Sequence, residues 1–173
     1  LESDGSYSPS KLALKLGTTD KTDFENITYT KYQGKKSKIL VIFTEQKNLK
    51  MKNGKLFSTG NHPVEALLPM LHLKNAGFDF EIATPTGKPV AFEMWAFPEK
   101  DEHVKAIYNE YKSSFEQPKK LQDFIDNSLT ESAAYAAVFV PGGHGAMLGI
   151  PENKNVGKAL NWAHENELFT ITL

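Results

Sequence analysis

The stretch AAVFVPGGHGAMLGIPE, residues 136–152, joins an apolar run to a turn rich in glycine. The run from Ala136 to Val140 predicts a buried strand that ends at Pro141. In open α/β sheets, ligands bind beyond the carboxyl ends of the strands. Bare backbone at Gly142 and Gly143 permits positive φ and the close approach of another group. The turn is therefore either a tight joint or a binding edge, and from the residues alone both interpretations stay open.

Working outward from this stretch, the chain repeats a pattern of apolar runs and amphipathic segments. The run Lys38–Thr44 (KILVIFT) is apolar throughout, which is typical of a central strand of a parallel sheet. Strands are predicted at 38–44, 78–83, 136–140 and 168–173, and those at 38–44, 136–140 and 168–173 have the apolar pattern of buried strands. Helices are predicted at 63–76, 101–115, 119–129 and 153–165. A strand, a helix and a strand with short joints form a βαβ unit, so the pattern predicts a doubly wound α/β fold.

The same pattern divides the chain into three parts. Residues 1–37 are polar and turn-rich, and we interpret them as an N-terminal arm with a short amphipathic piece at Leu12–Leu16. Residues 45–60 read as a polar loop. Residues 38–84 and 136–173 form the predicted α/β core. Residues 85–135 begin with several prolines, and we expect them to form an inserted helical cap beside the sheet.

Composition narrows the function classes. The 173 residues suit one domain, and a net charge of −1 from 20 basic and 21 acidic side chains does not favour nucleic acid or a membrane surface. No apolar run approaches the roughly 20 residues of a membrane span. The chain contains no cysteine, which excludes disulfides and thiolate metal sites within it and favours a cytoplasmic setting.

Glu65 and the histidines are the candidate chemical groups. Glu65 falls in the first turn of the predicted helix 63–76, where a carboxylate often satisfies free backbone N–H groups. If it were instead buried at the sheet edge, its pKa would rise and it could move protons. The five histidines share no metal-ligand spacing, and no HExxH, P-loop, GxGxxG or GxSxG pattern occurs. No nucleophile is visible in the chain.

Three segments together carry a family resemblance: NGKLFSTGNHPVEALLPMLHLKNAGFDFEIATPTG, FEMWAFPEKDE and AAVFVPGGHGAMLGIPE. Over residues 36–173 the chain resembles the ThiJ/PfpI superfamily and, within it, the HchA-type heat-shock branch. The resemblance implies a flavodoxin-like core with an inserted cap, a homodimer and no cofactor. It also implies a nucleophilic cysteine on a strained turn directly after Leu173, so we expect this chain to be one segment of a longer polypeptide.

The resemblance assigns roles to residues of the chain. The Gly143 N–H would belong to an oxyanion hole, and Glu65 matches a buried glutamate that the thiol holds and that helps move protons. Gly142 and His144 would line the substrate pocket. Some members of this branch bind a metal through His, Glu and His; the matching positions here are Lys74, Asp79 and Tyr111. A charged lysine is no ligand and tyrosine is a poor partner for zinc, so we predict no metal there.

The implied activity is that of a glyoxalase III and of a protein and nucleic-acid deglycase, with a role in the stress response. The substrates would be methylglyoxal and glyoxal, free or as early adducts, and the products lactate or glycolate. A cysteine hemithioacetal would be the intermediate. The alternative is a holding chaperone that uses exposed apolar surface, with Phe92, Trp95, Phe97 and the N-terminal arm as candidates. For these aromatic residues we favour packing onto the core.

Overall fold

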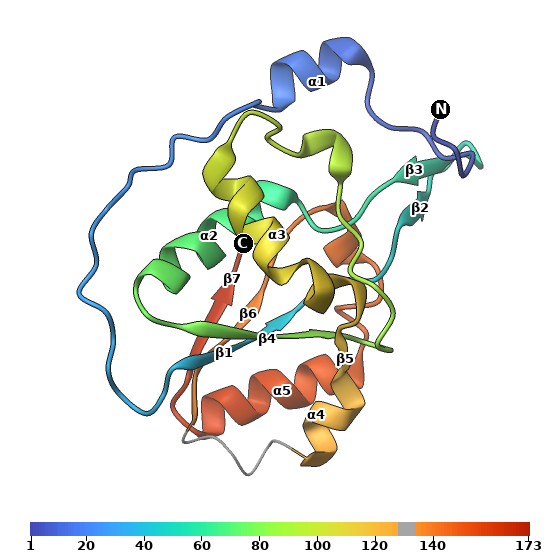
Figure 1. The fold of residues 1–173 in the computed structure, drawn as a ribbon. Helices are drawn as coiled ribbons and strands as arrows, with labels where there is room; N and C mark the ends of the chain where they lie inside the picture. The colour runs from blue at the N-terminus through green and yellow to red at the C-terminus, as the bar shows by residue number, and fades with distance from the viewer. Residues whose placement is uncertain (128–133) are drawn as a thin grey trace.

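A single five-stranded parallel sheet organises the molecule, whose computed structural model describes residues 1–127 and 134–173 (Figure 1). The strand order is β5-β4-β1-β6-β7. The strands are β1 Lys38–Ile42, β4 Asp79–Thr84, β5 Lys119–Lys120, β6 Tyr135–Val140 and β7 Phe169–Thr172. Every neighbouring pair runs parallel. The predicted doubly wound, flavodoxin-like α/β fold is confirmed.

Helices cover both faces of this sheet, as the layers in Figure 1 show. Successive side chains of a strand point to opposite faces. Ile39 and Val41 of β1 therefore join one buried cluster with α2 (Pro63–Asn75) and α3 (Glu102–Glu116). Leu40 and Ile42 join a second cluster with α4 (Leu121–Asn127) and α5 (Lys154–Glu165). Burial on both faces is why β1 is apolar at consecutive positions.

Helix α2 lies where the sequence predicted a helix at 63–76. His62 is the residue before the helix, Pro63 occupies its first position and suits the fixed φ there, and the His62 side chain makes no capping hydrogen bond. Gly77 follows the helix with a φ of 95°. A Cβ at Gly77 would lie 3.0 Å from the Tyr32 backbone nitrogen, because the N-terminal arm crosses this corner.

Helices α3 and α4 fall within the predicted cap, and both pack against the sheet. Val104, Ile107 and Phe115 of α3 are buried in the same cluster as Ile39 and Val41, and α4 packs with α5 on the opposite face. The strand β5 extends the sheet, since Lys119 pairs with Ala83 of β4. Apolar positions spaced along one side of α3 bury that side on the sheet, which makes it a covering helix. Leu129, at the predicted end of the second helix, lies outside the described residues; the boundaries of arm, core and cap stay a prediction.

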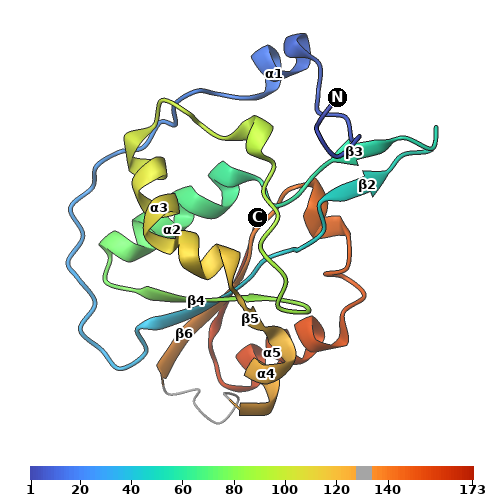
Figure 2. The same cartoon turned by 45° about the vertical axis from the view of Figure 1, so that its right-hand side comes forward.

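Residues 45–60, expected to be a polar loop, contain an antiparallel hairpin (Figure 2). Its strands are β2 Asn48–Lys50 and β3 Leu56–Ser58. The N-terminal arm adds to it, because Tyr7 N–H donates to the Leu56 carbonyl at 2.8 Å. Farther along the arm, α1 (Lys11–Gly17) forms where the amphipathic piece was expected, but it buries no residue.

The strand predicted at 168–173 is present as β7. β7 pairs with β6 at one edge of the described sheet, and Phe169 is 76% exposed. Ile171 alone among its residues packs against an apolar cluster. Within the described part of the chain, no helix is both long and apolar enough to cross a membrane.

Candidate active site

The diglycine turn lies at the carboxyl end of β6, against the start of α2. The Gly142 carbonyl accepts a hydrogen bond from the His62 N–H at 3.0 Å, and the Gly145 N–H donates to the Gly60 carbonyl at 2.8 Å. Gly143 has a φ of 114°, and a Cβ there would lie 2.6 Å from the Gly60 oxygen. The turn requires glycine because it packs directly on the backbone before α2.

The direction of the Gly143 N–H follows from these contacts. A trans peptide is planar, so the N–H of Gly143 points opposite to the Gly142 carbonyl and hence away from His62. Among the described residues, no acceptor bonds to this N–H, and Gly143 is partly exposed. A free, fixed N–H at a sheet edge is what an oxyanion hole requires.

Glu65 and the backbone of Leu173 meet at Gly142. A Cβ on Gly142 would collide with Glu65 Oε2 and would lie 2.6 Å from the Leu173 carbonyl oxygen. No described group donates a hydrogen bond to the Glu65 carboxylate, which disfavours a capping role. Glu65 is exposed in the described chain, and its burial in the complete protein, which the resemblance implied, stays a prediction.

His144 belongs to the same turn but engages a different group, Glu93. Glu93 is fully buried, and its Oε1 accepts hydrogen bonds from the Thr59 hydroxyl at 2.9 Å and from the His144 N–H at 3.1 Å. The His144 Nδ1 lies 2.8 Å from the same oxygen. The His144 ring packs near Phe57 and Trp95, with ring centres 5.4 and 6.3 Å away.

Glu93 was missed in the sequence. A signal was present, since a lone carboxylate stands between Phe92 and Met94-Trp95 in FEMWAFP, and a charge in an apolar run needs a partner. Its partners could not be found, because Thr59 and His144 are distant in sequence. Glu93 Oε2 is buried and has no hydrogen-bond partner among the described residues.

The aromatic side chains at positions 85–101 pack against other parts of the protein, as we expected. Phe97 is 8% exposed and lies in the apolar cluster of α2 and α3. Phe92 packs against Phe43 with ring centres 5.7 Å apart. The Trp95 Nε1–H donates to the Ser58 carbonyl at 3.0 Å. These three residues do not form an exposed apolar surface.

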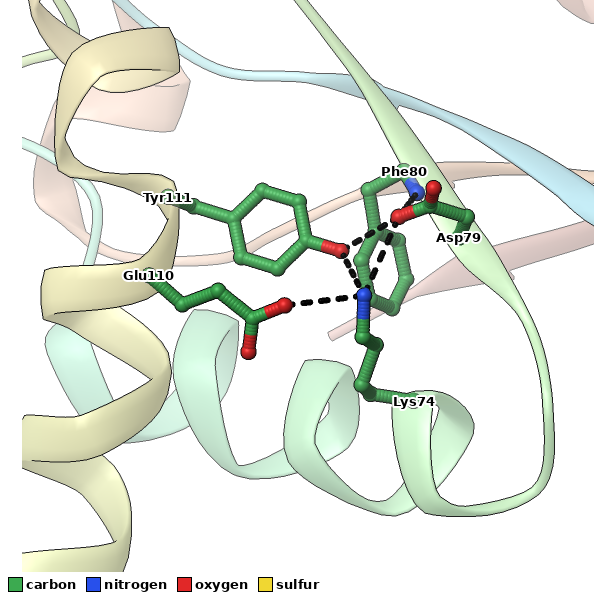
Figure 3. A network of polar contacts seen from close by, with 5 residues as sticks. All are labelled: Lys74, Asp79, Phe80, Glu110 and Tyr111. Atoms are coloured by element: carbon green, nitrogen blue, oxygen red, sulfur yellow. Dashed lines mark hydrogen bonds and ion pairs between the residues drawn. The ribbon is translucent and has the colours of Figure 1, made fainter.

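Lys74, Asp79 and Tyr111 do come together, and Glu110 joins them (Figure 3). Lys74 Nζ lies 2.8 Å from the Tyr111 hydroxyl, 2.9 Å from Glu110 Oε1 and 3.3 Å from Asp79 Oδ1. The Tyr111 hydroxyl donates to Asp79 Oδ1 at 2.5 Å. An ammonium group thus occupies the centre of the cluster, and these residues do not fit a metal ion.

The electrostatics of this cluster follow from its contacts. Burial, together with the hydrogen bond to Asp79, raises the pKa of Tyr111 to about 12. The Tyr111 hydroxyl is the main cause that lowers the pKa of Asp79. Burial opposes the charge of Lys74, but the contacts with Tyr111 and Glu110 outweigh it and raise the lysine pKa. The described residues contain no group of three or more His, Cys, Asp or Glu side chains suited to a metal.

Comparison with known proteins gives close sequence relatives. The chain is 49% identical over 170 residues to the protein/nucleic acid deglycase HchA of Escherichia coli O1:K1 and to that of strain UTI89. These alignments include 98% of this chain and 60% of each relative. The chain therefore spans about 60% of the length of the curated relatives it matches. No protein-family profile matches it.

Solved structures share the fold at lower sequence identity. The glyoxalase III of Candida albicans superposes with a TM-score of 0.60 at 22% identity, over 78% of this chain and 55% of that one. The Rapid Encystment Protein 24 KDa of Francisella tularensis superposes with a TM-score of 0.62 at 18% identity, over 79% and 57% of the two chains. At such identities the likeness shows the fold alone.

The fold is that of a doubly wound α/β protein. Over 98% of its length the chain is similar to deglycases of the HchA type, which supports its assignment to this branch of the ThiJ/PfpI superfamily.

Proposed function

We propose that the complete protein containing this sequence is an enzyme, a cofactor-independent glyoxalase III that also acts as a protein and nucleic-acid deglycase. One observation carries the proposal: Glu65, the diglycine turn and the Leu173 backbone converge at the carboxyl edge of the sheet. The relatives named deglycase HchA support the substrate class. By resemblance, the nucleophile is a cysteine directly after Leu173, which would stand beside Gly142 and Glu65.

The chemistry needs three groups at this edge. The thiolate adds to the aldehyde carbon of methylglyoxal and gives a hemithioacetal, whose oxygen the Gly143 N–H stabilises. Glu65, or a histidine after the cysteine, moves a proton from this carbon to its neighbour, so that one carbon is oxidised and the other reduced. Water then hydrolyses the thioester, which releases lactate, or glycolate when glyoxal is the substrate.

We extend the proposal to adducts, because the relatives are named protein/nucleic acid deglycases. The substrate would then be a hemiaminal on a protein or nucleotide amine. Attack by the thiolate with loss of the amine would yield the same hemithioacetal. We further propose a stress-response role and a homodimer, as the resemblance implies.

Product analysis tests the activity. The complete protein is incubated with methylglyoxal, and lactate is followed by NMR for the wild type, Glu65→Gln and Glu165→Gln. Glu165 is an exposed carboxylate at the end of α5 and serves as the matched control. Lactate formation that is abolished only in Glu65→Gln supports the proposal. Wild-type protein that forms no lactate, or a Glu65→Gln variant with the wild-type rate, contradicts it.

One observation favours the chaperone as a second candidate. Leu12 and Leu16 of α1 are 67% and 80% exposed, and none of the α1 residues is buried. Such a helix could hold unfolded protein by its apolar side. Suppression of aggregation that survives Glu65→Gln and is lost in the Leu12→Ser/Leu16→Ser double variant would support an independent chaperone role. If both variants still suppress aggregation, α1 does not take part in the chaperone activity.

A further inference from the structure

The structure assigns to Glu93 a task at the diglycine turn beyond holding the fold. Glu93 Oε1 receives three donors, from Thr59 and from the backbone and ring of His144, while Oε2 stays buried without a partner among the described residues. A buried oxygen without a hydrogen-bond partner destabilises the folded state. A carboxylate kept in this state between a turn and a histidine points to a function other than stability.

The first part of this task concerns the backbone. Three consecutive peptide groups of the turn are each fixed by another segment. The Gly142 carbonyl is held by the His62 N–H, the His144 N–H by Glu93 and the Gly145 N–H by the Gly60 carbonyl. Of these three partners, Glu93 acts through its side chain, whereas His62 and Gly60 act through their backbone. Without the hydrogen bond to Glu93, the peptide group between Gly143 and His144 is no longer fixed. The direction of the neighbouring Gly143 N–H is then less well defined.

The second part concerns the imidazole ring of His144. An ionised carboxylate only accepts hydrogen bonds, so the contact with Glu93 requires the proton on Nδ1. In the neutral ring, Nε2 is then an acceptor, and it lies on the side of the ring away from Glu93. The His144 side chain is 52% exposed, so this acceptor is open to a ligand.

We propose that Glu93 is a positioning residue that holds His144 as the Nδ1–H tautomer and presents its Nε2 to a hydroxyl group of the substrate. The hydroxyl is that of the aldehyde hydrate or of the hemiaminal adduct. This inference rests on the proposed function and names a substrate contact for it. His144 contacts the substrate, and Glu93 acts through His144 and the turn.

Kinetics of the complete protein test the role with matched variants. Glu93→Gln removes the charge and keeps the shape, whereas Thr59→Val removes another hydrogen bond to the same Oε1 and leaves the turn alone. We expect Glu93→Gln to lower kcat for methylglyoxal by about 10- to 100-fold with KM changed little, since the turn acts on the transition state. Thr59→Val should stay within about twofold of wild type on the same reasoning. Equal losses in both variants would show a structural role and overturn the proposal.

A second readout does not depend on activity. Long-range nitrogen–proton NMR of the imidazole distinguishes the tautomers of His144, with His144→Gln used to assign its signals. We expect the Nδ1–H tautomer in the wild type and a shift towards Nε2–H in Glu93→Gln. A wild-type ring with its proton on Nε2 overturns the proposal even if the variant does not fold. If the wild type turns over no aldehyde, the proposed function fails, while this spectrum still decides whether Glu93 holds His144.

Discussion

Gly142 lies against the carboxylate of Glu65, so closely that a methyl group on Gly142 would collide with Glu65 Oε2. The two residues come from different elements, the end of β6 and the first turn of α2. Their contact is possible because the parallel strands β1 and β6 are neighbours and both end at this edge. The same methyl group would lie 2.6 Å from the Leu173 carbonyl oxygen, at the end of β7.

Gly142→Ala is expected to destabilise the protein by about 1–3 kcal/mol, because the methyl group overpacks a site that includes rigid backbone. The Glu65 side chain can move aside, but the Leu173 carbonyl cannot. Urea unfolding measures the loss. Gly157→Ala is the control: Gly157 lies within α5 with nothing within 4 Å of its added methyl group, so it should gain about 0.5–1 kcal/mol. Equal stability of Gly142→Ala and wild type would contradict the contact.

Gly143→Ala should lower the stability of the protein by more than the backbone strain of a positive φ alone. Gly143 has a φ of 114°, and its added Cβ would lie 2.6 Å from the Gly60 oxygen. Gly54 has a φ of 80° and nothing within 4 Å, so Gly54→Ala carries only the backbone strain, about 1–2 kcal/mol. Thermal unfolding of both variants makes the comparison. A smaller loss in Gly143→Ala than in Gly54→Ala would show that the turn does not pack on the segment before α2.

The Lys74 cluster predicts a loss of stability at alkaline pH. The pKa of Tyr111 is raised from 10.0 to about 12 in the folded protein, and that of Lys74 is also raised. The unfolded chain therefore loses these protons first, so the stabilisation is complete below about pH 10 and is lost as pH rises through 12. Urea unfolding from pH 8 to 11.5 should show this fall, with a shallower slope in Tyr111→Phe. An equal slope in the variant would contradict the assignment.

Asp101 predicts a loss of stability at acid pH. Burial alone would raise the pKa of its carboxyl, but hydrogen bonds from Thr22, Val104 and His103 outweigh this effect and lower it. The stabilisation is thus present above the unfolded pKa of about 3.8 and lost as pH falls below it. Asp101 also caps α3 and binds the Thr22 N–H at 3.0 Å, which ties the N-terminal arm to the core.

Asp101→Ala should therefore destabilise the protein by about 1–3 kcal/mol and free the arm. Limited proteolysis should cut near residue 22 faster than in the wild type. Asn153→Ala removes the cap of α5 and has no contact with the arm, so it should lower stability without this cleavage. Faster cleavage near residue 22 in both variants would mean that global unfolding, not the Asp101 contact, controls the arm.

The sequence predicted those parts of the fold that local pattern determines. The predicted strand 38–44 and the predicted helix 63–76 match β1 and α2 to within two residues. The hairpin of β2 and β3 was missed because each of its strands has only three residues, too few to show an alternating pattern. The covering role of α3 was missed because its apolar side, at Val104 and Ile107, has meaning only once the sheet is placed.

The candidate site likewise contains residues that could be predicted from the sequence and residues that could not. The glycine-rich turn could be predicted from composition, because a positive φ such as that of Gly143 favours a residue without Cβ. Glu65 was ambiguous in sequence, because a carboxylate in the first turn of a helix can act as a cap or as a catalytic group. Glu93 could not be assigned, because its partners Thr59 and His144 are brought to it only by the folded chain.

In the proposed reaction, Glu65 and the diglycine turn act together on one reacting carbon. Turnover of methylglyoxal by the complete protein, compared among Glu65→Gln, Gly142→Ala and the double variant, tests it most directly. Groups that act as a unit are not additive, so the double variant should lose about as much kcat as the worse single variant. Losses that multiply, or wild-type turnover in either single variant, would contradict the claim.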